Sequence, residues 1–547
     1  MRRLNARARV HSKRKADVVM DPIKLQIRPG TRSNLFSRNS SSKHSKSSLF
    51  IFALISISFA LLLCYLLVFG RSSRNSVKRK YGIVIDGGST GTRIHVIEYR
   101  VENGNAVYDF GKDGLASMRV NPGLSAFAED SDGAGGSLKE LLEFGKGRVP
   151  KELWGQTEIR LMATAGLRLL ESKLRDRIME SCRRVLRSSV FKFRDEWASI
   201  ITGADEGIYA WVVANYALGT LGGDPLQTTG IIELGGASAQ VTFVSSESMP
   251  PEFSHSVRLG NITYNLYSHS FLHFGQNVAF DSLREALVLG DLNLVTESLE
   301  KGILIDPCTP KGYSHNVESW KLSPGSLDTK NRYLATLQSK GNFSECRNAA
   351  LMLLQKGKEK CSYQSCHIGS TFIPKLQGKF LATENFFYTS KFFDLAPRSF
   401  LSELMMAGQQ FCGEDWLELK KKYRSLKEED LLRYCFSSAY IVALLHDSLG
   451  VSFDDERIGV SNQVGNIPLD WALGAFILQS TAKFDLEHAH WIANIISNDS
   501  PTLLSIIAIF LVLMFVAWSV SKCRKPQFKT IYDLEKGRYI VTRVNRY

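Results

Sequence analysis

The sequence lacks the short motifs that mark several large classes of nucleotide and metal enzymes. Neither GxxxxGK(S/T) nor GxGxxG occurs, so the glycine patterns typical of P-loop and dinucleotide-binding domains are absent. No group of His and Cys residues has the spacing of a zinc site. Any phosphate or metal chemistry must therefore use a different arrangement of residues.

The body of the chain also lacks the positive charge expected of a nucleic-acid-binding protein. The 547 residues carry a net charge of +14, but residues 1–48 contribute +11 and residues 521–547 contribute +6. The remaining body is slightly acidic, at −3, which argues against nucleic acid as a partner. With 44% apolar and 22% charged residues, the chain has an ordinary globular composition.

Charged residues are absent from two long apolar runs near the ends. Leu49 to Gly70 has 22 uncharged positions, and Leu503 to Val520 has 18; about 20 apolar residues span a bilayer as a helix. The first run follows 48 residues and is too long for a cleavable signal, so we interpret it as a signal anchor. The second is interpreted as a transmembrane helix rather than a buried core helix, because Lys522, Arg524 and Lys525 follow it.

These spans fix an expected topology. The basic flank of the second span places the C-terminus in the cytosol. With two spans the N-terminus is cytosolic as well, and the body faces a lumen or the exterior. We expect a secretory-pathway membrane, such as the Golgi, a vesicle or the plasma membrane, with the bilayer as a partner. The oligomeric state is left open by the sequence.

Cysteine placement agrees with a lumenal body. Seven of the nine cysteines lie in the body, and six of these lie in its C-terminal half, which predicts disulfides formed in an oxidising compartment. The short spacing of Cys361 and Cys366 makes them the expected neighbour bridge, and Cys182 is left over as a buried thiol. Asn261 and Asn342 begin glycosylation sequons.

Two glycine-rich segments in the body share one design. One reads YGIVIDGGSTG, and the other, 147 residues further on, reads GIIELGGASAQ. Aligned without gaps, Asp86 matches Glu233, and Arg93 matches Gln240. The repetition predicts a duplicated α/β domain with two phosphate-binding loops facing one cleft, although two ordinary hairpin turns are the alternative.

The residue types in these segments suit phosphate binding. Glycines allow successive backbone N–H groups to form an anion-binding nest. Three hydroxyl groups add donors: Ser89, Thr90 and Thr92. Arg93 could neutralise phosphate charge or could be a surface residue. The acids at the strand ends, Asp86 and Glu233, can hold a hard divalent cation through water.

Two further segments place polar residues at predicted helix starts. In LMATAGLR, Thr164 follows a predicted strand and either faces the cleft or caps the next helix. The segment ITGADEG precedes a helical run over residues 208–218, and Glu206 is expected at the first turn of that helix. It is either a general base that takes a proton from water or an acid that complements the helix macrodipole, and position alone favours the macrodipole. His269 is more typical of packing than of a metal site.

Together these segments resemble the apyrase family, the nucleoside di- and triphosphate diphosphohydrolases. The family signatures occur in order over residues 81–478: IDGGSTGTRIHV, ATAGLRLL, ITGADEGIYAWV, ELGGASAQ and YNLYSHSFLHFG, followed by WALG. The resemblance implies an α/β fold of two ribonuclease-H-like, actin-like lobes with a nucleotide cleft, flanked here by two transmembrane helices. It also implies direct in-line attack of water on the terminal phosphate of nucleoside di- and triphosphates.

The predicted spans and the resemblance together give a domain order. It comprises a disordered basic cytosolic tail (1–48), a transmembrane helix (49–70), a linker (71–80), an N-terminal actin-like lobe (81–220), a C-terminal actin-like lobe with disulfides (221–480), a linker (481–502), a second transmembrane helix (503–520) and a basic cytosolic tail (521–547).

The resemblance assigns roles to matching residues. The catalytic residues are Glu206 as the base, Ser238 and Gln240 as holders of the water, and Thr164 beside the terminal phosphate. The substrate-binding residues are Gly88, Ser89, Thr90, Gly91, Thr92, Arg93, Gly235, Gly236, Ala237 and, stacked on the base, Tyr388. Ca²⁺ or Mg²⁺ is held through water by Asp86 and Glu233. The implied disulfides are Cys308–Cys346, Cys361–Cys366 and Cys412–Cys435.

Three positions depart from the family pattern. Glu233 stands where most members have Asp; its carboxylate is displaced by about one bond, and a 1 Å misplacement can cost on the order of 100-fold in rate. Asp86 is followed by Gly rather than Ala. Asp430 stands where ectonucleotidases have an Arg that stacks on the base, so selection for a nucleoside other than adenosine is expected to be possible.

Three functional hypotheses follow. The leading one is a membrane-anchored nucleotidase. The second is a lumenal nucleotide-binding sensor or scaffold that hydrolyses slowly because of Glu233. The third is another actin-like phosphotransferase, such as a sugar kinase or a polyphosphatase; a kinase is disfavoured because it must exclude the water that this sequence is equipped to position.

Overall fold

The structure is a computed structural model that describes residues 79–102, 105–111, 114–289, 303–318, 334–364, 366–396, 400–481, 528–533 and 537–543, together with residues 59, 511–513 and 515. Apart from those last positions, the predicted spans 49–70 and 503–520 and the tail 1–48 lie outside the described residues. Within the described part of the chain, no helix combines the length and hydropathy needed to cross a membrane. Both sheets discussed below belong to one compact unit, Val77–Tyr547.

The first lobe is built on a six-stranded sheet. Its strands are β1 (Arg79–Gly87), β2 (Thr92–Glu102), β3 (Asn105–Asp109), β4 (Leu115–Val120), β5 (Glu158–Ala163) and β6 (Ala198–Ile200). The strand order is β3-β2-β1-β5-β6, with β4 also on β2; β1 is antiparallel to β2 and parallel to β5. The apolar centre of β1 is buried on both faces, as expected for a central strand.

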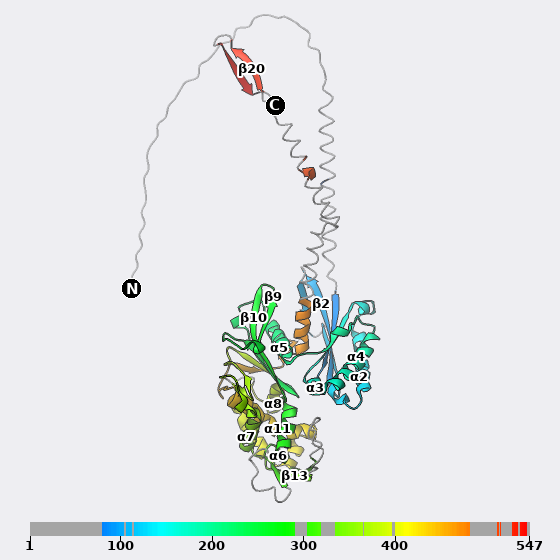
Figure 1. The fold of residues 1–547 in the computed structure, drawn as a ribbon, viewed down its shortest axis with the longest axis vertical. Helices are drawn as coiled ribbons and strands as arrows, with labels where there is room; N and C mark the ends of the chain where they lie inside the picture. The colour runs from blue at the N-terminus through cyan, green and yellow to red at the C-terminus, as the bar shows by residue number, and fades with distance from the viewer. Residues whose placement is uncertain are drawn as a thin grey trace, which may run out of the picture. The chain divides into compact units, whose positions relative to one another are not determined.

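Helices cover the outer face of this sheet. They are α2 (Ser131–Arg148) and α4 (Ser172–Arg187), while the short α3 (Ala165–Arg168) follows β5 directly. Side chains of β1 alternate between two cores: Ile83 and Ile85 pack with the outer helices, whereas Val84 packs with Trp471 and Phe476 on the opposite face. Figure 1 shows α2 and α4 beside β2.

The second lobe repeats the central arrangement. Its main sheet comprises β7 (Gly230–Leu234), β8 (Ser238–Val244), β9 (Ser254–Leu259), β10 (Ile262–Leu272), β16 (Phe380–Glu384) and β17 (Ile458–Val460). The order is β17-β16-β7-β8-β10-β9. As β1 does in the first sheet, β7 pairs antiparallel with the next strand and parallel with a later one. The predicted duplication of an α/β unit is therefore confirmed.

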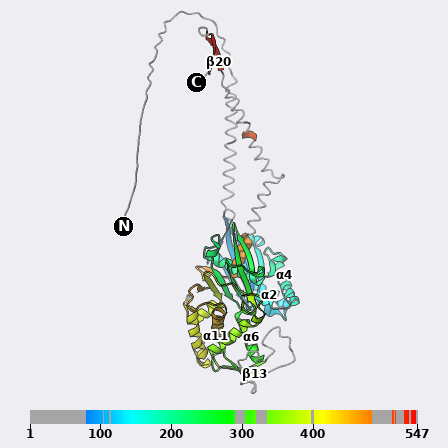
Figure 2. The same cartoon turned by 60° about the vertical axis from the view of Figure 1, so that its left-hand side comes forward.

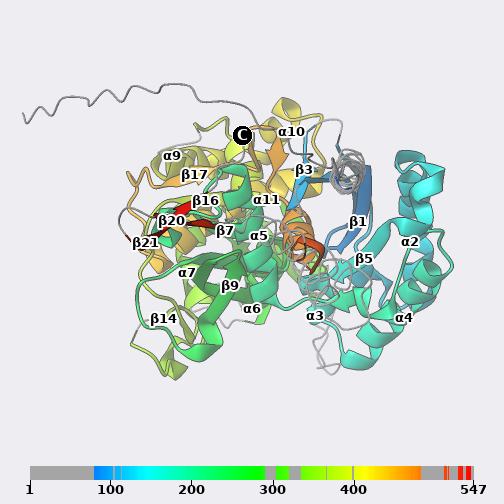
Figure 3. The same ribbon diagram turned by 90° about the horizontal axis from the view of Figure 1, so that it is seen from above.

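Two helices pack on the sheet of the lobe to which they do not belong by sequence. Helix α5 (Gly203–Ala217) precedes the predicted boundary at residue 220, yet it packs on the second sheet, where the Ser268 hydroxyl donates to the Ala204 carbonyl at 2.9 Å. The helix at residues 471–481 returns to the first sheet, where Phe476 lies 5.4 Å from the Tyr99 ring. The two helices cross closely: a Cβ on Gly474 would lie 1.8 Å from the Tyr209 carbonyl oxygen. Figure 3 shows them between the sheets.

Helix α5 begins earlier than the sequence predicted. The helical run was expected over residues 208–218, but the helix starts at Gly203. Thr202 is its N-cap and accepts a hydrogen bond from the Asp205 N–H at 3.1 Å. Glu206 lies in the first turn of the helix, as predicted.

Further helices and small sheets complete the second lobe. The helices are α6 (Gln276–Leu289), α7 (Phe343–Gln355), α8 (Asn385–Phe392), α9 (Phe400–Gly413), α10 (Trp416–Lys422) and α11 (Glu428–Val442). The small strands are β11 (Ile303–Asp306), β12 (Ser314–Glu318), β13 (Leu334–Ser339), β14 (Cys366–Ile368), β15 (Thr371–Phe372), β18 (Gln463–Val464) and β19 (Ile467–Pro468). Figure 2 shows α6 and α11 together with β13. In the C-terminal segment, β20 (Phe528–Asp533) pairs with β21 (Arg538–Arg543).

The disulfides tie these additions to the core. All three predicted bridges are present: Cys308–Cys346, Cys361–Cys366 and Cys412–Cys435. The last joins α9 to α11. Cys182 is a buried free thiol, as predicted, and burial raises its pKa to about 12, so this thiol stays protonated and unreactive at neutral pH.

Candidate active site

Two tight turns carry the predicted phosphate loops. The first joins β1 to β2, and the second joins β7 to β8. In the registers of these hairpins, Asp86 lies opposite Arg93, and Glu233 lies opposite Gln240. The acid and the polar residue seven positions later, which the sequence relates only by spacing, are therefore cross-strand neighbours in both lobes.

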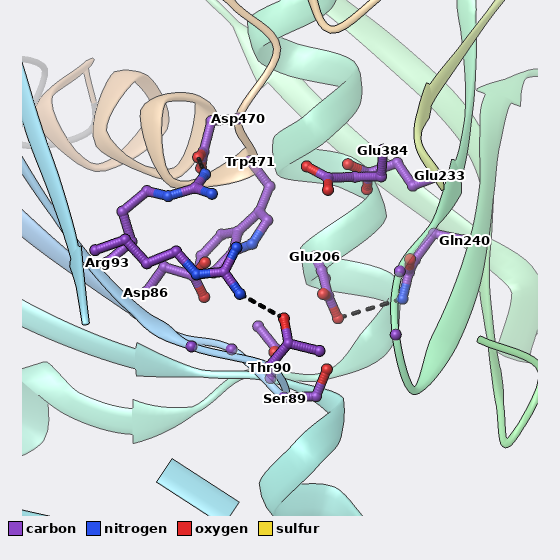
Figure 4. A pocket seen from close by; sticks show the side chains of 16 residues that line it. Asp86, Ser89, Thr90, Arg93, Glu206, Glu233, Gln240, Glu384, Asp470 and Trp471 are labelled. Atoms are coloured by element: carbon purple, nitrogen blue, oxygen red, sulfur yellow. Dashed lines mark hydrogen bonds and ion pairs between the residues drawn. The ribbon is translucent and has the colours of Figure 1, made fainter. Parts of the chain in front are cut away.

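The two turns face each other across a cleft. A Cβ on Gly236 of the second turn would lie 3.0 Å from both the Ser89 hydroxyl oxygen and the Thr90 methyl carbon of the first. The cleft holds a cavity of about 110 Å³, and Figure 4 shows side chains of both lobes converging on it. Most predicted site residues line this cavity: Asp86, Gly88, Ser89, Thr90, Gly91, Arg93, Thr164, Glu206, Glu233, Gly235, Gly236 and Gln240.

Glu206 is the best-placed base in the cleft. Its carboxylate is buried, and Oε2 accepts hydrogen bonds from Arg168 Nη2 at 2.8 Å and from Gln240 Nε2 at 3.3 Å. Among the described residues no donor to Oε1 is seen, which leaves that oxygen for water. Burial raises the pKa of Glu206, and the charge and hydrogen bond of Arg168 oppose that rise. A role limited to the helix macrodipole does not require this buried, partnered position.

Gln240 links the base to two serines. Its Nε2 donates to Ser238 Oγ at 2.5 Å and to Ser270 Oγ at 3.0 Å. Ser270 lies opposite Gln240 in the β8–β10 register, and Arg168 Nη2 is 3.5 Å from the same hydroxyl. Ser270 was not predicted, although it belongs to the quoted YNLYSHSFLHFG signature. The result is a polar cluster around the base, drawn from both lobes.

Thr164 occupies the N-cap position of α3 but does not act as a cap. Its side chain makes no capping hydrogen bond, and it lines the cavity instead. Of the two interpretations that the sequence left open, the structure therefore favours the one in which Thr164 faces the cleft.

The acids at the two strand ends have unsatisfied oxygens. Asp86 Oδ1 and Glu233 Oε2 are buried without a hydrogen-bond partner among the described residues. Burial raises the pKa of both carboxyls; the charge of Asp470 adds to the rise at Asp86, and that of Glu206 at Glu233. An unpaired buried carboxylate is costly, so these two residues fit a bound cation. In the described part of the chain no three acids, His or Cys are close enough to ligate a metal directly.

Arg93 is engaged with another residue rather than free for phosphate. Its Nη1 lies 2.6 Å from Asp470 Oδ2, and His95 Nε2 lies 3.2 Å from the same oxygen. Burial alone would raise the pKa of Asp470, but His95 and Arg93 hold it well below its usual range. Asp470 Oδ1 in turn accepts the Ala472 N–H at 3.1 Å. Arg93 thus fixes the start of the helix at residues 471–481, and with it Trp471 in the cleft.

Four lining residues were not predicted as site residues: Arg119, Glu384, Asp470 and Trp471. Only Trp471 carried a sequence signal, as the first residue of WALG. Arg119 is exposed, lies opposite Arg93 in the β2–β4 register, and donates from Nη2 to Thr90 Oγ1 at 2.9 Å. It reaches the first phosphate loop without an ion-pair partner within 4 Å among the described residues.

Four predicted residues do not line the cavity. Thr92 is fully buried, and Ala237 and Ser238 are buried as well. Ser238 contacts the site through Gln240. Tyr388 on α8 is 48% exposed, and Asp430 is exposed in the first turn of α11. Most residues that were predicted to contact phosphate therefore line one cavity, whereas Tyr388, which was predicted to stack on the nucleobase, lies outside that lining.

Two duplicated α/β lobes with facing loops and a buried glutamate between them define an actin-like nucleotide phosphatase fold. The chain matches the GDA1/CD39 (nucleoside phosphatase) family over residues 72–489 and belongs to that family. It is 58% identical to "Probable apyrase 6" of Arabidopsis thaliana over 557 aligned residues, covering 100% of both chains. It is 33% identical to mouse ectonucleoside triphosphate diphosphohydrolase 1 over 427 residues, which cover 72% of this chain and 80% of that protein.

A solved structure shares the fold. A nucleoside triphosphate hydrolase of Neospora caninum aligns with a TM-score of 0.57 at 17% identity, over 79% of this chain and 97% of that one. At this identity the likeness supports the fold alone. The α/β actin-like architecture and the nucleoside phosphatase family are thus both established for this chain.

Proposed function

We propose that this protein is a membrane-anchored apyrase that converts nucleoside tri- and diphosphates to lower phosphates, ultimately the monophosphate, and orthophosphate. The observation that carries the proposal is the buried Glu206, held by Arg168 and Gln240 at the edge of a cleft between two facing glycine-rich loops. A base, a water-holding amide and two anion-binding turns are the parts that direct hydrolysis needs.

In this mechanism the terminal phosphate lies between the two turns. Backbone N–H groups of residues 88–91, 236 and 237, with the hydroxyls of Ser89, Thr90 and Thr164, stabilise its oxygens; the Gly235 N–H instead donates to the Ser238 carbonyl at 3.0 Å and closes the turn. Gln240 holds the attacking water, and Glu206 takes its proton. The water oxygen bonds to phosphorus as the bridging P–O bond breaks, and the leaving oxygen stays on the shorter nucleotide. No residue is bonded covalently to phosphate.

Asp86 and Glu233 are the residues that would hold the divalent cation, Ca²⁺ or Mg²⁺, through its water shell. Their orphaned oxygens, Asp86 Oδ1 and Glu233 Oε2, support this assignment. When bound, a hard cation neutralises charge on the phosphate oxygens. The two acids come from corresponding positions in the two lobes, so they approach the phosphate chain from opposite sides of the cleft.

The remaining features concern the nucleoside and the compartment. Tyr388, exposed on α8 just after the lining residue Glu384, is the proposed stacking surface for the base. Residues 49–70 and 503–520 are the proposed membrane anchors, with both termini cytosolic and the body lumenal or extracellular in the secretory pathway. The three disulfides of the body agree with that compartment.

The test is phosphate release by the full-length protein from ATP, ADP, GTP, GDP, UDP and IDP, each with calcium, magnesium or chelator. Glu206→Ala and the isosteric Glu206→Gln should bind nucleotide but lose about 100- to 10,000-fold in turnover. Glu359→Gln, an exposed acid outside the cleft, is the matched control. Unchanged turnover in both Glu206 variants would contradict the assignment of the base.

The substrate profile separates the remaining possibilities. Release from both tri- and diphosphates fits an apyrase, and release from GDP and UDP alone fits a diphosphatase that supports glycosylation. Folded wild-type protein that binds nucleotide but releases no phosphate would favour the sensor hypothesis, and Glu233→Asp would then be the next variant to measure.

A further inference from the structure

The acids of the cleft divide into paired and unpaired groups. Five carboxylates line the cavity: Asp86, Glu206, Glu233, Glu384 and Asp470. Two of them have ion-pair partners, since Glu206 binds Arg168 and Asp470 binds Arg93. Within the described residues the other three have no cation within 4 Å. The unpaired acids are therefore Asp86 and Glu233, which the sequence predicted from the two glycine-rich segments, and Glu384, which lies outside those segments and was not predicted.

Glu384 is held in an unfavourable backbone conformation. It is the last residue of β16 and has φ 60° and ψ −118°, a region that glycine adopts readily and other residues rarely do. Two asparagine amides fix it there: the Glu384 N–H donates to Asn462 Oδ1 at 2.7 Å, and Asn385 Nδ2 donates to the Leu234 carbonyl at 2.7 Å. The fold thus stabilises a strained glutamate at a position where glycine costs less.

The strained position aims the side chain at the cation site. Strand β16 pairs with β7 so that Thr383 lies opposite Glu233, one residue before Glu384. Figure 4 shows Glu384 and Glu233 both directed into the cavity. Glu233 is only 5% exposed, and its Oε2 has no hydrogen-bond partner among the described residues. That orphaned oxygen independently indicates a ligand at this place.

We propose that Glu384 is a third carboxylate of the cation site and, with Asp86 and Glu233, holds the water shell of the divalent cation. The inference deepens the proposed function and rests on it, because it adds a residue to the same site. Additional carboxylates raise the affinity of an oxygen site for a hard cation. Glu384 lies on β16, the strand next to that of Glu233, so its carboxylate stands beside a glutamate at the position where most family members have the shorter aspartate.

The test measures cation binding without nucleotide. Tb³⁺ is a hard-cation probe for Ca²⁺ sites, and Trp471 lines the same cavity and can sensitise its luminescence. Full-length wild-type protein, Glu384→Gln, Glu384→Gly, Asp86→Asn and the exposed control Glu359→Gln are titrated with Tb³⁺, and the Tb³⁺ is then displaced with Ca²⁺. Both Glu384 variants should weaken binding about 10- to 100-fold, and Glu359→Gln should not change it.

Thermal unfolding of the cation-free proteins shows whether a Glu384 variant binds the cation weakly because it lacks the carboxylate or because it is poorly folded. Glycine takes φ 60° without strain, so Glu384→Gly should melt at a higher temperature than wild type while binding the cation more weakly. If Asp86→Asn weakens binding and both Glu384 variants stay within twofold of wild type, this inference is wrong and the proposed cation site stands. If Asp86→Asn also binds normally, the cation part of the proposed function fails with it.

Discussion

The ion pair between Arg168 and Glu206 allows a direct test of how the base is kept reactive. The two charged atoms lie 2.8 Å apart, and the side chains are only 15% and 11% exposed. Arg168→Met keeps an apolar side chain of similar length but leaves Glu206 as a buried carboxylate without the guanidinium that pairs with it. Removing one partner of a buried pair costs about 3–5 kcal/mol of folding free energy, so the variant should be clearly less stable near neutral pH.

Activity and stability should both change with pH. Burial raises the pKa of Glu206, and Arg168 opposes the rise; in Arg168→Met the pKa rises further. The base must be ionised, so the acid limb of the rate profile should move to higher pH. Because the folded-state pKa lies above the unfolded value, about 4.3, the loss of stability should be smallest below that value and grow as pH rises through the folded-state pKa.

The assay is kcat/KM for phosphate release from about pH 5 to about pH 9, with urea denaturation at each pH. Arg347→Met is the matched control. Arg347 holds Asp447 through two hydrogen bonds of 2.7 and 2.6 Å, with side chains 24% and 17% exposed, and neither residue lines the cleft. That variant should lose stability and keep the wild-type rate profile. An unshifted acid limb in folded Arg168→Met protein would refute the reasoning.

Three further predictions concern separate parts of the molecule. Arg119→Gln should raise KM for ATP and ADP about tenfold with little change in kcat, because a charge-assisted bond to phosphate contributes about 1.5 kcal/mol; an unchanged KM would exclude Arg119 from binding. Cys412→Ser/Cys435→Ser should lower the free energy of unfolding by about 3 kcal/mol, since the bridge closes a loop of sequence separation 23, while urea midpoints equal to wild type would contradict this. Asn261, exposed in the β9–β10 turn, should carry a glycan; an endoglycosidase mobility shift that survives Asn261→Gln/Asn342→Gln/Asn498→Gln, which removes the three sequons of the body, would contradict the lumenal topology.

The sequence predicted what local patterns can encode. The two glycine-rich segments have similar sequences, and in each of them the acid and the polar residue seven positions later are cross-strand neighbours: Asp86 with Arg93, and Glu233 with Gln240. The spacing predicts this pairing because the turn of a hairpin fixes its register. The disulfides followed from the resemblance, and Glu206 from its signature. The position of Glu206 alone favoured a macrodipole role, and its burial beside Arg168 is the observation that supports its proposed role as the base.

The residues that the sequence missed reach the cleft through long-range pairing. Arg119 lies in the cleft because β4 pairs with β2. Glu384 lies there because β16 pairs with β7, and Glu384 is 150 residues beyond its partner Leu234 in the chain. Neither carries a turn signal or a recognisable spacing to the loops. The ion-pair partner of Arg93 was not predicted for the same reason, because Asp470 is 377 residues away.

The proposed base depends on elements of both lobes. Glu206 lies on α5, which packs on the second sheet, and its cation Arg168 comes from α3, directly after β5 of the first. The third partner, Gln240, belongs to β8 of the second sheet. Since a 1 Å misplacement can cost on the order of 100-fold in rate, we expect the proposed base to work only while both lobes hold it. Neither lobe alone contains Glu206 with both of its partners, Arg168 and Gln240. For this reason the duplication that the sequence reveals does not by itself reveal the proposed catalytic site.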